Sequence, residues 1–145
     1  MTTQSNTQLP LLQKEHGGTQ FIAFNERNVE MPQQEGTEPI QMYEYDSVRT
    51  PIGADYGTLV TAIIRTRYTS DQVEAIVLNH GDGNPDHEAE YNALQQWRTE
   101  AKHVAKLALR QQWRKDINDA KERITELEAA EIEVEESVSI DQQSE

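Results

Sequence analysis

The sequence predicts an α+β protein, in which a small N-terminal β element of two or three strands packs on a helical hairpin and is followed by a long C-terminal helix. Side chains of strand-forming types that fall alternately on two faces indicate strands at 19–26 and 40–48. Apolar residues at helical spacing indicate helices from about residue 55 onward. No Gly or Pro follows Pro85, so the last helix meets no chemical stop before the acidic end of the chain.

Composition and charge exclude several classes of protein. The chain of 145 residues has a net charge of -13 and no cysteine, which excludes disulfides, thiolate metal sites and a cysteine nucleophile. Residues 1–48 hold two basic and seven acidic side chains, and residues 115–145 hold three and eleven, whereas the middle of the chain is balanced. Without a basic surplus, nucleic acid is not an expected partner. No stretch approaches the ~18 apolar residues that span a bilayer, so a membrane is not expected either.

The two strand candidates differ in how clearly they alternate. In the first, Phe21 and Ala23 face one way while Ile22 and Phe24 face the other. The second, residues 40–48, is the stronger, with tyrosines along one of its faces. Two or three strands of this length need a cover, and we expect the helices that follow to supply it.

The chain divides into four expected segments. Residues 1–18 are rich in Gln, Thr and Ser and predict a flexible arm. Residues 19–110 form the expected α+β domain, and residues 111–127 continue its last helix as an extension with the spacing of a short coiled coil. Residues 128–145 are acidic with scattered Ile and Val, and we expect this tail to be disordered.

Three helices supply the expected core. The chain turns helical after Asp55, a capping box of Thr69 and Gln72 opens the second helix, and Pro85 opens the third. The first two helices, joined near Tyr68, are expected to form an antiparallel hairpin. The predicted core side chains, which recur on one face of each helix, are Leu59, Val60, Ile63, Ile64, Val73, Ile76, Val77, Leu94, Trp97 and Val104.

The long helix carries a second row of apolar residues beyond the domain, which we call the apolar seam. Its members recur at intervals of three and four. The step from Ala108 to Ile117 is out of register with a heptad, so either the two halves of the helix face different partners or the helix breaks or shifts phase at 109–115. The residues expected at a partner interface are Trp113, Ile117, Ala120, Ile124 and Leu127.

The segment LNHGDGNPDHE, residues 78–88, is the richest in potential metal ligands. The candidate ligands are His80, Asp82, Asp86 and His87. A calcium loop of the EF-hand type is excluded, since its sixth position would be His87 and its twelfth Ala93. A turn between helices explains most of the segment: Gly81 ends one helix, Asn84 caps the next and Pro85 begins it. We therefore expect no metal and no other cofactor.

Catalytic motifs are absent from the sequence. No serine lies in a nucleophile elbow, and the chain has neither a phosphate-binding glycine loop nor an H-E-x-x-H motif. We therefore expect a protein that is not an enzyme.

One block of the chain resembles a known family. The segments MYEYDSVRTP, ADYGTLVTAIIRTRYTSDQVEAIVLN and EYNALQQWRTEAKHVAK are similar to small proteins encoded among the tail genes of tailed bacteriophages and prophages, of which the XkdW-like group is an example. The resemblance covers roughly residues 42–106. It implies an accessory role in the tail or tail fibre, without catalytic or ligand-binding residues.

These observations predict a non-enzymatic phage structural or assembly accessory protein, located in the virion or the host cytoplasm. Its expected partners are phage tail proteins or a second copy of itself, bound through the apolar seam. An alternative of a different class is an acidic inhibitor that binds a host protein by mimicking nucleic acid, with its acids on an ordered face. A second alternative is a metal-binding protein that uses the loop at residues 80–88.

Overall fold

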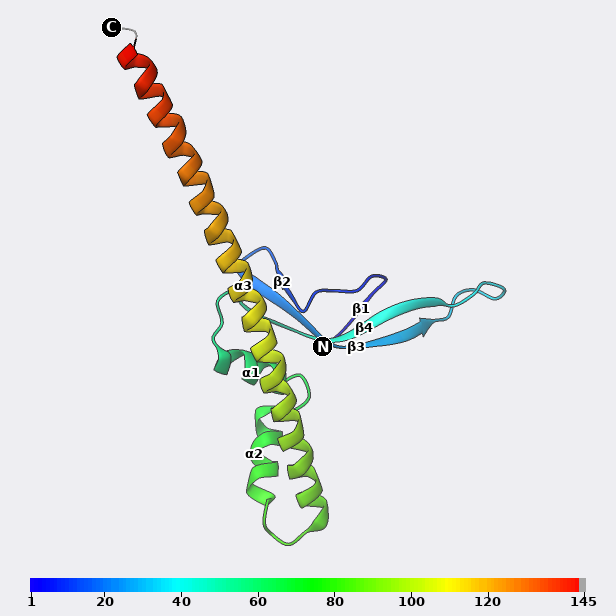
Figure 1. Ribbon diagram of the computed structural model, residues 1–145. Coiled ribbons are helices and arrows are strands. Elements are labelled where there is room, and N and C mark those ends of the chain that lie inside the picture. Colours follow the sequence, from blue (N-terminus) through cyan, green and yellow to red (C-terminus); the bar gives the residue numbers. More distant parts are fainter. Residues whose placement is uncertain (144–145) are drawn as a thin grey trace. The chain divides into compact units, whose positions relative to one another are not determined.

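The computed structural model describes the backbone of residues 1–143 and the side chains of residues 1–136. A four-stranded antiparallel sheet is followed by three helices (Figure 1), which confirms the predicted α+β class. The elements in chain order are β1 (Thr2–Ser5), β2 (Leu12–Lys14), β3 (Thr19–Met31), β4 (Ile40–Pro51), α1 (Tyr56–Ile64), α2 (Ser70–Asn79) and α3 (Pro85–Gln143). They form two compact units, Met1–Leu109 and a second that begins at Arg110.

The β3–β4 hairpin forms the centre of the sheet, whose strand order is β1-β4-β3-β2. Ile22 lies opposite Val48 in this hairpin. The register shifts between Phe24 and Arg27, where Asn25 adopts a positive φ of 57°. Asn tolerates this backbone conformation better than most residues, and the extra residue forms a β-bulge. The alternation that predicted the first strand therefore holds only as far as Phe24.

The segment 1–18, which was expected to be a flexible arm, supplies both edge strands instead. β1 pairs with β4 and β2 pairs with β3. Between them Leu9 packs on the sheet face that carries Tyr45, and its backbone N–H donates to the Tyr45 hydroxyl at 2.9 Å. That hydroxyl donates in turn to Glu26 at 2.6 Å. Backbone hydrogen bonds to a sheet edge require no apolar pattern, which is why the polar sequence of this segment did not indicate strands.

The opposite face of the sheet packs on the helices and forms the main core. Its buried side chains come from β3, α1 and α3, and they are Ile22, Phe24, Leu59, Ile63, Trp97, Ala101, Ala105 and Ala108. Small alanines on α3 let its backbone approach its neighbours closely. Of the predicted core residues, Leu59, Ile63, Leu94 and Trp97 are fully buried. Val60, Ile64, Val73, Ile76 and Val104 are half-buried.

Trp97 joins the three layers of this core. Its ring lies 6.2 Å from that of Phe24 on β3, centroid to centroid. Its indole N–H donates to the carbonyl oxygen of Ile64 at the end of α1, at 3.4 Å. The guanidinium of Arg67 lies 3.6 Å above the ring, within the range of a cation–π interaction. One buried side chain therefore contacts the sheet, α1 and the α1–α2 link.

The short helices α1 and α2 lie one after the other along the first part of α3 (Figure 1). The N-terminus of α1 is capped by Asp55, and that of α2 by the predicted capping box of Thr69 and Gln72. The expected antiparallel pairing of α1 with α2 is therefore wrong, and the hairpin is formed by α2 and the start of α3. The end of α1 contacts α3, through the hydrogen bond from the Trp97 indole to the carbonyl oxygen of Ile64.

Val77 does not belong to the core, contrary to the prediction. It is 48% exposed, and its neighbour Leu78 is 75% exposed. Val73 and Ile76 are half-buried, and no residue of α2 is fully buried. Because α2 lies along the start of α3, only a narrow stripe of it is covered, and Val77 falls outside that stripe.

The acidic tail is helical, so the expected disorder is wrong for residues 128–143. The prediction for residues 144–145 lies outside the described part of the chain. Nor is α3 interrupted at 109–115, where a break was one of two alternatives. Ala, Glu, Lys, Arg and Gln make up more than half of residues 109–143, and these residue types favour the helix even without burial.

Two leucines of different burial test the packing of the core. Leu59 is 1% exposed, and replacing it by alanine leaves a cavity, so Leu59→Ala should lower the free energy of unfolding by about 2–5 kcal/mol. The matched control is Leu78→Ala, which should change it by less than about 0.5 kcal/mol, since Leu78 is 75% exposed. Urea denaturation followed by circular dichroism measures both values, and equal losses would contradict this core.

The stability of the sheet should fall at acid pH. Hydrogen bonds from Arg27 and then Gln4 hold the pKa of Glu44 below its ordinary value of 4.5, and Arg49 does the same for Glu15. A carboxyl with a lowered folded-state pKa stabilises fully above its ordinary pKa, and the contribution is lost as pH falls through the folded value.

The measurement is the melting temperature between pH 7 and pH 3. Glu44→Gln should melt below the wild type at pH 7, and the difference should shrink as the pH falls through the lowered folded-state pKa of Glu44, where the wild-type carboxyl becomes protonated. Glu38→Gln, in the exposed loop between β3 and β4, is the charge-matched control and should show the wild-type pH dependence. Parallel curves for Glu44→Gln and the wild type would contradict a role for this carboxylate.

Candidate interaction surface

The apolar seam is exposed in the second unit. Trp113 is 58% exposed, Ile117 54%, Ile124 56% and Leu127 65%, and Ala120 is exposed as well. Between Arg110 and Glu136 no side chain is buried. Helical stability in proteins comes mostly from packing of an apolar face, and the described side chains of this stretch are not buried in that way. The seam is therefore a surface without an intrachain cover among the described residues.

The seam extends beyond the predicted interface residues, which end at Leu127. Val134 lies seven residues after Leu127 and is 63% exposed. In heptad notation Trp113, Ala120, Leu127 and Val134 occupy d, while Ile117, Ile124 and Glu131 occupy a. The interval of seven could have identified Val134 from the sequence. Glu131 is the one charged residue in the a/d row between Trp113 and Val134.

A shallow hollow lies at the far end of the seam. It is lined by Leu127, Ala130, Glu131, Val134 and Glu135. The first four occupy d, g, a and d, the four positions that form a hole for a knob in coiled-coil packing. The hollow therefore coincides with the set of positions that surrounds a partner's side chain in a coiled coil.

Ile132 offers a useful contrast to the seam. It is 57% exposed, close to the value for Ile124. It follows Glu131 by one residue, so at about 100° per residue it faces away from the seam. The two isoleucines are equally accessible on the same helix but lie on different sides of it.

The glutamates near the end of the described helix do not form one face. Residues 124–136 hold six glutamates and no basic residue. Successive residues differ by about 100° around a helix, so Glu131 and Glu133 lie about 160° apart. An acidic surface that mimics a nucleic acid backbone would need its charges along one side. The helix is ordered here, as that alternative requires, but its carboxylates are distributed around it.

The predicted turn at residues 80–88 holds its candidate metal ligands in two separate pairs. His87 Nδ1 lies 2.6 Å from Asp82 Oδ2, and His80 Nδ1 lies 3.1 Å from Glu88 Oε2. The His80 ring is also stacked on Tyr91, with centroids 3.6 Å apart. Asp86 directs its backbone N–H to the side chain of Asn84 at 3.0 Å, which makes Asn84 the N-cap of α3 as predicted.

Both histidines have a structural role in this turn. The backbone N–H of Asn84 and then the His87 imidazole hold the pKa of Asp82 below its ordinary value. Gly81 and Gly83 have φ values of 87° and 84°, which glycine adopts at little cost and which the reversal between α2 and α3 uses. Among the residues that the structure describes, no group of three His, Cys, Asp or Glu side chains is placed to hold a metal ion.

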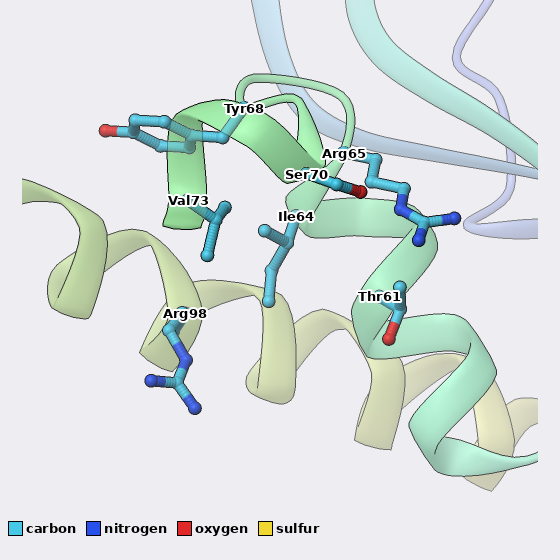
Figure 2. Close-up of a pocket in the computed structure, with 7 residues that line it drawn as sticks. All are labelled: Thr61, Ile64, Arg65, Tyr68, Ser70, Val73 and Arg98. Carbon is cyan, nitrogen blue, oxygen red and sulfur yellow. The ribbon is translucent and has the colours of Figure 1, made fainter. Parts of the chain in front are cut away.

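A second hollow lies where α1, α2 and α3 meet (Figure 2), with a volume of about 380 Å³. Figure 2 shows that Arg65, at the end of α1, and Arg98, on α3, flank the apolar side chains of Ile64 and Val73. Both arginines are exposed and Tyr68 is half-buried. The lining holds no buried polar side chain that would orient a small molecule, so the hollow lacks the usual features of a ligand site.

Comparison with protein-family models, curated proteins and solved structures finds no match to this chain. None of the described helices combines the length and the apolar composition that crossing a membrane requires. The interpretation of the interaction surface therefore depends on the chemistry of its residues.

A metal titration tests the alternative use of the 80–88 loop. Isothermal calorimetry with Zn²⁺, Mn²⁺ and Ca²⁺ should give no saturable heat, because His80 and His87 are each engaged with a different carboxylate. The double variant His80→Ala/His87→Ala supplies the baseline for weak surface binding. A saturable signal in the wild type that this variant lacks would contradict the structural role of the turn.

Proposed function

We propose that this protein is a non-enzymatic accessory protein of phage tail or tail-fibre assembly, which acts by protein–protein contact through the apolar seam of α3. The supporting observation is a helix whose apolar row, Trp113 to Val134, is exposed in the isolated chain. Burial of one such row against a partner helix is the usual source of stability for a coiled coil. The resemblance of residues 42–106 to tail-cluster proteins supports the phage setting.

The two units would have different roles in assembly. The unit Met1–Leu109 has its own core and supplies a stable body, whereas the helix from Arg110 onward supplies the docking surface. The acidic residues would keep the protein dispersed before assembly, since a net charge of -13 opposes non-specific association. Such a protein would work in the virion or in the host cytoplasm.

The acidic inhibitor is the second candidate, because the glutamates of residues 126–136 lie on an ordered helix. Neutralising glutamates that lie away from the seam distinguishes docking by the seam from acidic inhibition. The variant Glu126→Gln/Glu136→Gln removes two of six charges without touching an a or d position. It should leave docking by the seam intact, whereas it should weaken the binding of a protein that recognises the negative charge itself.

Co-production with the products of the neighbouring genes tests the proposed function. The wild-type chain should sediment with at least one of these products as a tail or fibre complex. Ile124→Asp should be lost from that complex, because a buried, unpaired charge in a helix interface costs several kcal/mol. Ile132→Asp is the matched control and should be retained. Equal recovery of both variants, or absence of the wild type from every complex, would contradict docking by the seam.

A further inference from the structure

The charge pattern of α3 indicates what covers the apolar seam. We propose that the helix from Arg110 onward pairs in antiparallel orientation with the same helix of a second copy of this chain. The proposal rests on the docking role given above and adds its partner and geometry. Three observations carry it: the segregation of charge along the helix, the charge at the flanking positions, and the hollow at the end of the seam.

Charge is segregated along the second unit. Residues 110–123 hold five basic and three acidic side chains, whereas residues 124–136 hold six acidic and none basic. A parallel, in-register pair would place the two strongly acidic segments side by side along their whole length. An antiparallel pair places each acidic segment against a stretch that contains the basic residues of the other copy, which is the electrostatically favourable arrangement.

One antiparallel register satisfies both the seam and its flanks. With Ile124 opposite Leu127 of the second copy, Ile117 faces Val134 and the apolar layers match. At the flanking e positions, Lys121 then faces Glu128 of the second copy. Symmetry repeats each of these contacts. The core layer between these two apolar layers places Ala120 of one copy opposite Glu131 of the other.

Arg114, also at an e position, forms a second pair of opposite charges. In the same register it faces Glu135 of the second copy, one heptad from the Lys121–Glu128 pair. Shifting the register by one heptad in either direction brings Lys121 against Lys121 or Glu128 against Glu128. Like charges directly opposed disfavour those alternatives. The register is therefore specified by charge as well as by the apolar layers.

A parallel dimer also offers opposite charges at its flanks, through Asp116 with Lys121 and Arg123 with Glu128. These flanking pairs by themselves therefore do not separate the two orientations. The segregation of charge along the helix and the core layers do. In the parallel, in-register pair, Glu131 would face its own copy at a core position. In the antiparallel pair it faces Ala120, a small side chain that leaves room for the carboxylate to reach water.

The hollow on α3 supports the same orientation. It is lined by Leu127, Ala130, Glu131, Val134 and Glu135. A parallel partner would insert its own Glu131 into this mainly apolar hole, which desolvates a charge. The antiparallel partner inserts Ala120, whose methyl group fits without that penalty. The shape and the charge of the surface therefore favour the same partner and the same direction.

Sedimentation equilibrium of the full chain tests for the second copy. The mass should rise with concentration from 16.6 kDa to twice that value. Ile124→Asp should raise the dissociation constant about 100-fold or more, because an apolar layer is lost and a charge is buried. Ile132→Asp carries the same substitution at an equally exposed site off the seam and should dimerise as the wild type does. Circular dichroism of each variant shows that the fold is retained.

Disulfide cross-linking tests the orientation, since the chain has no cysteine of its own. The double variant Ala120→Cys/Glu131→Cys should form covalent dimers on mild oxidation, because positions 120 and 131 of opposite copies are adjacent. Each single variant should not, since positions 120 of the two copies are eleven residues apart along the antiparallel pair, about 16 Å. Efficient dimers from Ala120→Cys alone would establish the parallel pair and overturn the proposed orientation.

The outcomes separate this inference from the proposed function. A wild-type chain that stays monomeric at all concentrations overturns the second copy as the partner. The docking role would stand in that case if Ile124→Asp still abolished the complex with the neighbouring gene products and Ile132→Asp did not. A dimer that Ile124→Asp leaves intact would overturn the inference as well, because the contact would then lie elsewhere on the chain.

Discussion

Trp97 is the residue on which the first unit depends. Its ring contacts Phe24 of the sheet, its indole N–H bonds to the end of α1, and Arg67 from the following link lies over its face. These three contacts link the β3–β4 hairpin, α1 and α3 in one core. They also determine the course of the chain, because α1 is held on α3 and α2 continues along the same helix. Alanines at 101, 105 and 108 keep α3 close enough for the contacts to form.

The second unit, in contrast, has no buried side chain among its described residues, Arg110 to Glu136. It is helical from Arg110 to the end of the described chain. Its sequence nevertheless keeps an apolar residue at nearly every third and fourth position. A solvated helix has no physical need for such a row, whereas a helix that packs on another does. The regular spacing supports the proposed docking role, and the segregated charges along the same helix support the proposed pairing of two copies.

The sequence indicated the elements with strong local signals. The capping box at Thr69, the Asn84–Pro85 start of α3 and the apolar row of α1 were identified from short-range chemistry, and the structure has them in place. The edge strands in residues 1–18 were missed because they are held by backbone hydrogen bonds to β3 and β4, which leave no trace in a polar sequence. The acidic composition of residues 128–143 predicts disorder, whereas the helix propensity of their Glu, Ala and Gln residues favours the helix that the structure has. In the candidate site, periodicity alone found five seam residues and could have found Val134.

By itself the sequence determined the α+β class, the helix starts, the burial of Trp97 and the position of the apolar seam, since each depends on residues close together in the chain. Only the tertiary structure decided what packs on what. It placed α2 on α3 instead of α1, left Val77 outside the core, and paired His80 with Glu88 and His87 with Asp82. These outcomes depend on which surfaces meet, and periodicity defines a face of a helix without naming its partner.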